Sequence, residues 1–377
     1  MLKYSSKSAL ILISFIFLFN LLGLKHTLAQ ENYEGIVFAN HKALPGYGFK
    51  KARHPEMFQG NNKKKNYFEG WYFKMVSSDG NTILSIIPGI SLSRDGKEQH
   101  AFIQTIDGKT AQTEYYSFPI EQFSFSKSEF AIAIGPNYFS KDKIILNIQQ
   151  DSTHLKGEVF LSNQMELSPR KFLNGGIMGW YRFVPFMQCY HGVVNLSNTL
   201  HGTITRNDTT YQFDQGIGYI EKDWGNSMPS SWIWMQSNNF YAGNSSFMLS
   251  IANIPWLGKS FTGFLGFFLH NGTIHRFATY THAKLSMQTS SNDTIHIQIK
   301  DKNYSYFIEA IRNNSGQLKA PVNGSMDRRI AESIDAQIKL TVYDNKAQLL
   351  YSDSSAISGL EIVGDTKLLT TKLKKQK

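Results

Sequence analysis

Cysteine is almost absent from this sequence: Cys189 is the only one in 377 residues. Since one cysteine cannot form an internal disulfide, apolar burial must stabilise the fold, and a chain of this length can bury a sizeable core. A cysteine nucleophile and a cysteine-based metal site are both disfavoured.

Several catalytic motifs are absent as well. The sequence contains no Gly-x-Ser-x-Gly elbow, no glycine-rich phosphate loop and no His-Glu-x-x-His zinc motif. The histidines of the second half do not cluster in the sequence; they are His191, His201, His270, His275 and His282. Hydrolysis by a triad and metal catalysis are therefore disfavoured, and we expect no metal site.

The one long apolar run lies at the amino terminus, from Ala9 to Leu24. Lys3 and Lys7 precede it, and Thr27-Leu28-Ala29 offers the small residues that a signal peptidase reads. The run is short for a membrane span of roughly 20 residues. We therefore predict a secretory signal peptide at residues 1–29 and a secreted, periplasmic or endomembrane location. An uncleaved membrane anchor is the alternative.

Positive charge is in modest excess, with a net charge of +10. Three lysines belong to the signal segment and five to a basic tail at residues 364–377, so the remainder is close to balanced. A basic face for nucleic acid is therefore not expected. The tail is either simply solvated or weakly attracted to an anionic membrane, which would be a peripheral membrane contact.

The mature chain has the texture of a β protein. After an irregular lead-in at residues 30–65, short runs of Phe, Tyr, Ile, Val and Thr are separated by Asp-Gly turns at 79–80, 95–96 and 107–108. Residues 123–126 and 130–134 alternate between large apolar and smaller side chains, which is typical of half-buried strands. We predict an all-β fold.

The chain also contains an internal echo. Trp71, Ser85-Ile86 and Phe102 recur as Trp232, Ser250-Ile251 and Phe267, with one four-residue loop insertion. Apart from chance similarity between alternating strands, this pattern favours a duplication of antiparallel β units, which we place at 66–200 and 201–363. Barrels suit the pattern, since closure removes edge strands and can leave a pocket for an apolar ligand.

The segment 216–225 carries two carboxyl groups, Glu221 and Asp223, which point the same way if the backbone is extended. Three tryptophans follow, Trp224, Trp232 and Trp234, and they line either a core or a pocket. Carboxyl groups among aromatic rings acquire a raised pKa, because burial disfavours the ionised form. The structural alternative is a turn in which Lys222 neutralises one acid and Trp224 fills a barrel end.

Three further places are candidates for the site. Glu69 lies in an aromatic strand, where an acid needs solvent or a partner. His100 and Gln104 alternate on one strand face, either as ligand contacts or as a polar pair at a strand end. His191 follows Tyr190 and precedes a glycine, in a turn that would aim the imidazole, although a lone histidine is more often structural.

Five runs together resemble the tocopherol cyclase family: residues 67–74, 184–193, 218–225, 229–238 and 276–281. The most specific are Glu-Lys-Asp-Trp-Gly at 221–225 and Pro-Ser-Ser-Trp-Ile-Trp at 229–234. The resemblance covers roughly residues 40–360 in the same order. That family is related to carotenoid hydratase-like proteins and implies two tandem lipocalin-like antiparallel β barrels.

The resemblance implies an enzyme that closes a chromanol ring from a prenylated phenol or quinol, without a redox cofactor or a protein partner. A proton adds to the alkene, and the phenolic oxygen attacks the tertiary cation. At the matching positions we expect Asp223 to supply the proton, with Glu69 as the second candidate, and Tyr190 and His191 to orient the phenol. The expected substrate contacts are Trp71, Tyr72, His100, Glu221, Trp224, Trp232, Trp234 and Gln236.

Two other functions fit the same residues. A secreted lipocalin-like carrier would bind an apolar isoprenoid or lipid without catalysis. A tryptophan-rich carbohydrate-binding or glycoside-cleaving protein would suit secretion, but no pair of acids at a defined separation can be assigned to it. A secretory signal in place of a plastid transit peptide also separates this chain from the family's usual substrate, so the substrate is expected only as a class of apolar isoprenoids.

Overall fold

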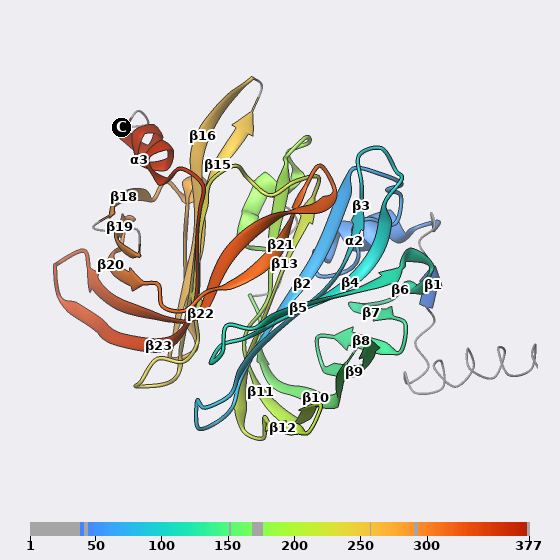
Figure 1. The fold of residues 1–377 in the computed structure, drawn as a ribbon. Helices are drawn as coiled ribbons and strands as arrows, with labels where there is room; N and C mark the ends of the chain where they lie inside the picture. Colours follow the sequence, from blue (N-terminus) through green and yellow to red (C-terminus); the bar gives the residue numbers. More distant parts are fainter. Residues whose placement is uncertain are drawn as a thin grey trace, which may run out of the picture.

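The computed structural model describes residues 38–40, 44–150, 152–167, 176–256, 258–289 and 293–374. Within them the protein is nearly all β, with two large sheets that lie side by side (Figure 1). Every strand pair described is antiparallel. The predicted all-β class with two antiparallel units is thus confirmed, whereas closure into barrels stays a prediction. The predicted signal peptide lies outside the described residues.

The first sheet contains 13 of the described strands. In order across the sheet they are β1 (Phe38–Asn40), β6 (Phe123–Ser126), β7 (Ala131–Ile134), β8 (Asn137–Ser140), β9 (Lys143–Gln150), β10 (Thr153–Met165), β11 (Cys189–Arg206), β13 (Gly216–Gly225), β2 (Tyr67–Val76), β3 (Ile83–Leu92), β4 (Gln99–Asp107) and β5 (Thr113–Pro119), with β12 (Thr209–Gln212) paired to β11.

The second sheet contains 10 of the described strands. In order they are β17 (Thr273–Ala278), β16 (Lys259–His270), β15 (Ser245–Trp256), β14 (Trp232–Ser237), β23 (Leu349–Val363), β22 (Ser325–Asp344), β20 (Tyr304–Ile311), β19 (Thr294–Lys300) and β18 (Lys284–Thr289), with β21 (Gly316–Val322) paired to β22.

Helices are short in the described residues. They are α2 (Tyr47–Arg53), η1 (Ile120–Gln122), η2 (Gly176–Phe183), which is kinked at Gly179, η3 (Thr279–Thr281) and α3 (Thr366–Lys374). α3 corrects our view of the basic tail, because Leu369 is buried in the core of the second sheet and its carbonyl accepts a hydrogen bond from Thr262 Oγ1. No described helix is long and apolar enough to cross a bilayer.

Among the described residues, three large apolar cores result from these sheets, beside a small cluster of Ala131 and Tyr138. One lies within the first sheet and contains Trp71 and Phe123, and another lies within the second and contains Ile251 and Tyr306. The third, which we call the central core, joins residues of both sheets: Tyr72, Tyr219, Trp232, Trp234, Met248 and Phe267 are among them. Strands at the centre of the molecule therefore bury both faces, one in their own sheet and one against the other sheet.

The change from the first sheet to the second falls between Gly225 and Trp232. The predicted join at 200/201 falls inside β11, which pairs with β10 on one edge and β13 on the other. A division there would split a strand that is hydrogen-bonded on both sides. The first sheet therefore continues to Gly225, beyond the boundary that we placed at residue 200, while the division into domains stays a prediction.

The two halves of the predicted repeat have the same order of strands, but their equivalent tryptophans are buried in different cores. Trp71 and Trp232 each lie on the first strand of a three-strand meander, β2–β3–β4 and β14–β15–β16. Trp71 is nevertheless buried within the first sheet, whereas Trp232 is buried in the central core. Duplication of the unit stays a prediction.

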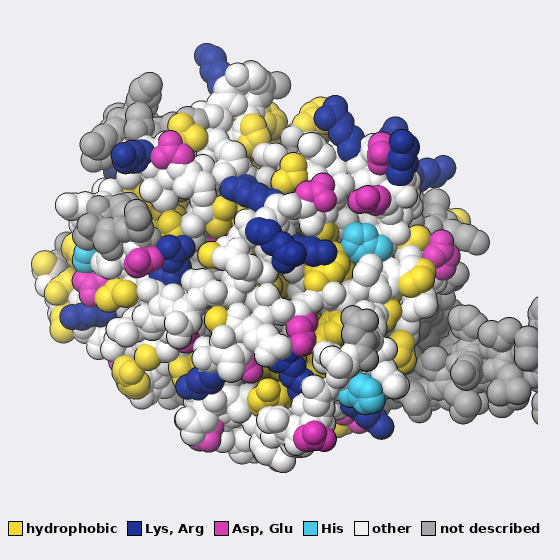
Figure 2. Space-filling view, viewed as in Figure 1, with side chains coloured by type: hydrophobic (Ala, Val, Ile, Leu, Met, Phe, Trp, Pro, Cys, Tyr) yellow, Lys and Arg dark blue, Asp and Glu magenta, His cyan; other side chains and the backbone are white. Residues whose placement is uncertain are grey.

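The surface face seen in Figure 2 carries Lys and Arg side chains interspersed with Asp and Glu. Apolar side chains show between them in small groups rather than as one continuous patch. This face has the mixed charge that a nearly balanced composition leads us to expect.

Candidate active site

A pocket lies between the two sheets beside the central core, with about 1480 Å³ of empty space, including the part open to solvent. Its wall combines residues of β2, β11 and β13 with residues of β14, β15, β16, β21, β22 and β23. Apolar side chains such as Met178, Met187, Phe261 and Leu318 make up much of the lining. Such a pocket is suited to an apolar ligand that a few polar groups orient.

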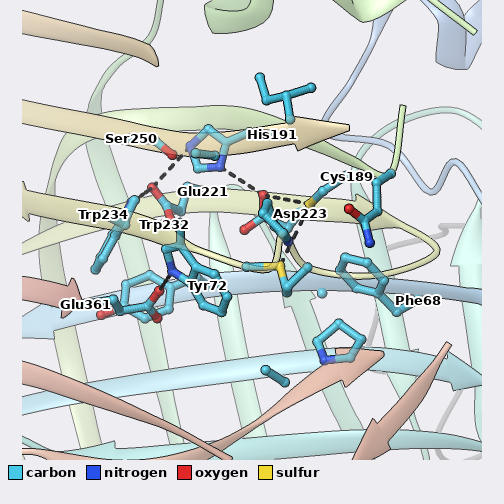
Figure 3. A pocket seen from close by; sticks show the side chains of 18 of the residues that line it. Phe68, Tyr72, Cys189, His191, Glu221, Asp223, Trp232, Trp234, Ser250 and Glu361 are labelled. Carbon is cyan, nitrogen blue, oxygen red and sulfur yellow. Dashed lines mark hydrogen bonds and ion pairs between the residues drawn. The ribbon is translucent and has the colours of Figure 1, made fainter. Parts of the chain in front are cut away.

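Glu221 and Asp223 face this pocket from β13, as their spacing predicts. Directly paired residues of antiparallel strands point to the same face, and the register sets His191 of β11 opposite Asp223 and Tyr72 of β2 opposite Glu221. His191 Nδ1 lies 2.9 Å from Asp223 Oδ1, and its Nε2 lies 3.6 Å from Glu221 Oε2 (Figure 3).

These neighbours shift the pKa of His191. Burial by itself lowers the pKa of the imidazole, but the carboxylates of Asp223 and Glu221 outweigh burial and raise it to about 9. His191 is therefore cationic at neutral pH. It forms an ion pair with Asp223, whose Oδ1 also lies 3.9 Å from Cys189 Sγ.

Glu221 is held by donors from both sheets. Its Oε2 accepts hydrogen bonds from Tyr219 O–H at 2.7 Å and from Trp234 Nε1–H at 3.2 Å. Burial raises the pKa of Glu221 to about 7, while His191 and these two donors oppose the rise because they stabilise the ionised form.

A second group of acids, Glu332 and Glu361, lines the wall formed by β22 and β23. The two residues are direct cross-strand partners, so their side chains lie next to each other on one face of the sheet. Tyr72 O–H donates to Glu332 Oε1 at 2.7 Å, and Trp232 Nε1–H donates to Glu361 Oε2. Burial raises the pKa of Glu332 to about 7; burial and the charge of Glu332 raise the pKa of Glu361 well above its ordinary range.

Lys74 is buried next to this second group. Its Nζ donates to Ile357 O at 2.9 Å and to Gln236 Oε1 at 3.3 Å. Burial lowers the pKa of Lys74 to about 7, and the carboxylate of Glu332 opposes that change. A cation at Lys74 can therefore balance negative charge on the carboxyl groups.

Indole rings connect the two groups of acids. Trp234 lies opposite Glu361 in the sheet while its N–H reaches Glu221, and its ring stands edge-on to Tyr72 with centroids 5.4 Å apart. Gly359 makes room for Trp234, since a Cβ atom at this position would lie 2.6 Å from the indole. The aromatic side chains are thus fixed beside the carboxyl groups.

Glu69, the second candidate for the proton donor, lies outside this pocket. It is 0 % exposed on the other face of β2, where Lys222 Nζ is 2.5 Å from its Oε1. Further donors to the carboxylate are Gln59 N–H, Gly60 N–H and Tyr67 O–H. Lys222 thus neutralises Glu69 rather than Glu221 or Asp223, and this acid is part of the core of the first sheet.

Trp71, Trp224 and Tyr190 lie on the same inner face as Glu69. The register pairs Trp224 with Glu69 on one side and with Tyr190 on the other, so all three point away from the pocket. Tyr190 stacks on Trp224 with centroids 5.5 Å apart and donates its O–H to Val184 O. Trp71 Nε1–H donates to Glu56 O.

His100 and Gln236 also lie outside the pocket lining. His100 Nε2 is 2.5 Å from Tyr115 Oη, and Gln236 is buried against Lys74. Gln104, which we paired with His100, does line the pocket. The predicted residues that the structure brings together there are Tyr72, His191, Glu221, Asp223, Trp232 and Trp234.

Sequence reasoning missed Glu332 and Glu361. Glu361 stands between Leu360 and Ile362 in an apolar strand, and an acid at such a place signals a buried carboxyl group. Pairing of β22 with β23 places Glu361 next to Glu332. Neither stretch of sequence by itself predicts that these two strands pair.

One part of the site has ligand atoms that could hold a metal ion. One atom each from His191, Glu221 and Asp223 lies within 4.8 Å of the others. An imidazole and two carboxylates are donors that divalent cations accept. Our expectation that the protein needs no metal therefore stays a prediction.

Comparison with known proteins shows that much of this chain, including part of the pocket, matches one family model. The family model for tocopherol cyclase-like proteins matches residues 169–364, which include all four pocket acids. Chloroplastic tocopherol cyclase of Zea mays is 28% identical over 74 residues, which are 20% of this chain and 16% of that protein. The match thus spans only a small part of the length of this relative.

Solved structures are similar to this chain at low sequence identity. The crystal structure of CghA is similar with a TM-score of 0.51 and 9% identity, over 87% of this chain and 95% of that one. Kievitone hydratase from Nectria haematococca has a TM-score of 0.44 and 10% identity, over 86% and 97% of the two chains. With more than half of its length matched by the family model, the chain belongs to the tocopherol cyclase-like family.

Proposed function

We propose that this protein catalyses proton-initiated closure of a chromanol ring from a prenylated phenol or quinol. The observation that carries the proposal is the pocket between the sheets, where carboxyl groups with raised pKa values lie beside indole rings in an otherwise apolar lining. Membership of the tocopherol cyclase-like family supports the same reaction.

The reaction needs a proton donor, a proton acceptor and protection of a cation. A carboxyl O–H breaks as a C–H bond forms at the alkene, and the phenolic oxygen then attacks the tertiary cation. The phenolic proton passes to a carboxylate, so the product is an isomer of the substrate and no electrons are gained or lost. Carboxyl groups with raised pKa values can hold a transferable proton near neutral pH.

The lining suits the remaining demands of this step. Trp232 and Trp234 present aromatic rings next to the acids, and aromatic faces attract cations. The apolar side chains of β15 and β16, such as Ile254, Phe261 and Leu265, can accommodate an isoprenoid tail and exclude water that would trap the cation.

Asp223 fits the role of proton acceptor better than the role of donor that we expected from the sequence. Its carboxylate forms an ion pair with cationic His191, whose Nδ1 lies 2.9 Å from Oδ1. A carboxylate in this state can receive the phenolic proton. His191 then orients Asp223 toward the substrate.

The test uses the purified protein and a prenylated hydroquinone. We expect a product of unchanged mass and changed retention, which carries one deuterium on carbon when the reaction runs in deuterated water. Asp223→Asn should retain binding and lower turnover by about 100-fold or more, the usual contribution of a general acid or base. Tight binding without any product would contradict the proposal and identify the protein as a lipocalin-like carrier.

A further inference from the structure

Glu332 and Glu361 are set apart from the other acids by their mutual contact. They face each other across β22 and β23, both line the pocket, and each accepts a hydrogen bond from an aromatic side chain, Tyr72 or Trp232. We infer that this carboxyl pair shares one proton and that Glu361 delivers it to the alkene of the substrate. The inference rests on the proposed ring closure and assigns its proton donor.

The cross-strand pairing favours a shared proton. Two carboxylates side by side on one sheet face repel each other strongly, so the ionisation of one disfavours the ionisation of the other. The raised pKa of both groups agrees with this state. The pair is therefore a proton store at neutral pH.

Glu361 is the member placed to release the proton. As a whole residue it is half-buried where it lines the pocket, whereas Glu332 is 1 % exposed. Glu332 also accepts the O–H of Tyr72, which itself accepts a hydrogen bond from Ser85 Oγ at 2.9 Å, and these bonds favour negative charge on Glu332. The proton is thus held on Glu361, toward the pocket.

The other two acids of the pocket have His191 as a neighbour. Asp223 is paired with its Nδ1. Glu221 accepts two hydrogen bonds at one oxygen and has His191 Nε2 3.6 Å away. These partners limit the rise in the pKa of Glu221 to about 7, whereas the pKa of Glu361, which has no cation beside it among the causes of its shift, rises well above its ordinary range.

The charges that face the pair act on its proton in opposite directions. Lys74 on β2 can carry a positive charge beside Glu332, while Glu221 and Asp223 on β13 add negative charge that makes the pair hold its proton until substrate arrives. In the step itself, the Glu361 O–H bond breaks and a C–H bond forms, while the phenolic proton goes to Asp223. Exchange with solvent then returns a proton to Glu361 and removes one from Asp223.

Infrared spectroscopy tests the shared proton without any substrate. A protonated carboxyl group has a C=O stretch distinct from that of a carboxylate, and we expect wild-type protein at neutral pH to show this band. Glu361→Gln should remove the part of the band that persists above the pKa of Glu221, which is about 7. Glu332→Gln should move the titration of this part to lower pH, because the charge that raises the pKa of Glu361 is gone. Asp223→Asn and Glu309→Gln, a control on β20 whose side chain is 44% exposed, should keep it. The same band above the pKa of Glu221 in Glu361→Gln would overturn the inference.

Turnover of the prenylated hydroquinone tests the delivery of the proton. Glu361→Gln should bind substrate as wild type does and lower kcat by about 100-fold or more. In Glu332→Gln, the alkaline limb of the pH profile of kcat/KM should move to lower pH, which loss of packing alone would not cause. Glutamine preserves the shape and hydrogen bonds of a protonated glutamic acid, and thermal unfolding of each variant checks the fold.

The two proposals fail in different ways. If wild-type protein turns over the substrate and Glu361→Gln does so equally well, the assignment of the donor is wrong and the proposed function stands. If wild-type protein produces no isomer, the proposed function is wrong, and the infrared band alone decides whether the pair stores a proton.

Discussion

Glu69 and Glu221 lie on neighbouring strands and are both fully enclosed by protein, yet their chemistry differs because their neighbours differ. Glu69 meets a lysine ammonium, two backbone N–H groups and a phenol, so every neighbour stabilises its charge. Glu221 meets one imidazolium but shares its pocket with three other carboxyl groups. At the scale of the residue, the neighbours of a carboxyl group decide its role: it either stabilises the fold as part of an ion pair or carries a proton.

The contact between Glu69 and Lys222 gives a prediction for stability. Lys222→Met leaves the Glu69 carboxylate buried without its cation, and breaking a buried ion pair in this way costs about 3–5 kcal/mol. Chemical denaturation of wild type and variant measures this loss in the free energy of unfolding.

The control is the double variant Glu69→Gln with Lys222→Met, which removes both charges. It should be more stable than Lys222→Met alone, since the unpaired charge is gone. Equal stability of the single and double variants would mean that the pair carries no such coupling. Neither variant touches the lining of the pocket.

At the scale of the element, alternation along β13 shows what sequence could and could not predict. The spacing of Glu221 and Asp223 correctly put both side chains on one face of a strand. The same pattern on β2 could not tell which face that was, because residues of both parities are buried there: Glu69 and Trp71 on one side, Tyr72 and Lys74 on the other. Only the pairing of distant strands resolves this choice.

The carboxyl-terminal helix is the second element that sequence did not predict. Its lysines suggested a solvated tail, and a single apolar residue outweighs them: Leu369 is 0 % exposed in the core of the second sheet. Burial of one leucine side chain stabilises by roughly 1.5–3 kcal/mol, while Lys367 remains exposed on the same helix.

Leu369→Ala therefore tests how α3 is attached. Truncation of a buried leucine should lower the free energy of unfolding by about 2–5 kcal/mol, as measured by urea denaturation. Lys367→Ala, at an exposed position of the same helix, should change it by less than about 0.5 kcal/mol. Similar values for both variants would show that the helix does not dock where the structure places it.

At the scale of the whole molecule, the acids of the pocket come from both sheets. His191, Glu221 and Asp223 belong to the first sheet, while Glu332 and Glu361 belong to the second. Cross-sheet hydrogen bonds, such as Trp234 to Glu221 and Tyr72 to Glu332, fix the two groups relative to each other. Folding of both sheets together is thus a condition for assembling the site.

This arrangement makes stability depend on pH. The folded state raises the pKa of Glu332 from about 4.5 to about 7, so between these values it binds a proton that the unfolded chain releases. The stabilisation from this group is complete below pH 4.5 and is lost as the pH rises through 7. Wild-type protein should therefore lose stability across this window relative to Glu332→Gln, in which the titrating group is absent.

Urea denaturation at several pH values measures the difference between the two proteins. Tyr72, Lys74, Glu221 and Glu361 face Glu332 and are present in both proteins. The Glu332 charge raises the pKa of Glu361 and of Lys74, so the difference between the two curves includes the change in these two neighbours. Curves that stay parallel from pH 4.5 to 7 would show that Glu332 titrates normally in the folded protein.

The division of the pocket between two sheets also bears on how the proposed reaction could change among relatives. The proton donor that we infer lies on the second sheet, and the acceptor that we propose lies on the first. The distance between the two carboxyl groups therefore depends on how the sheets pack against each other. A small shift of one sheet relative to the other would deliver the proton to a different carbon of a bound chain. The hydrogen bonds within each sheet would stay as they are. Residues 226–231 connect the two sheets. A relative with a longer or shorter connection there could place the donor and the acceptor at a different distance from each other.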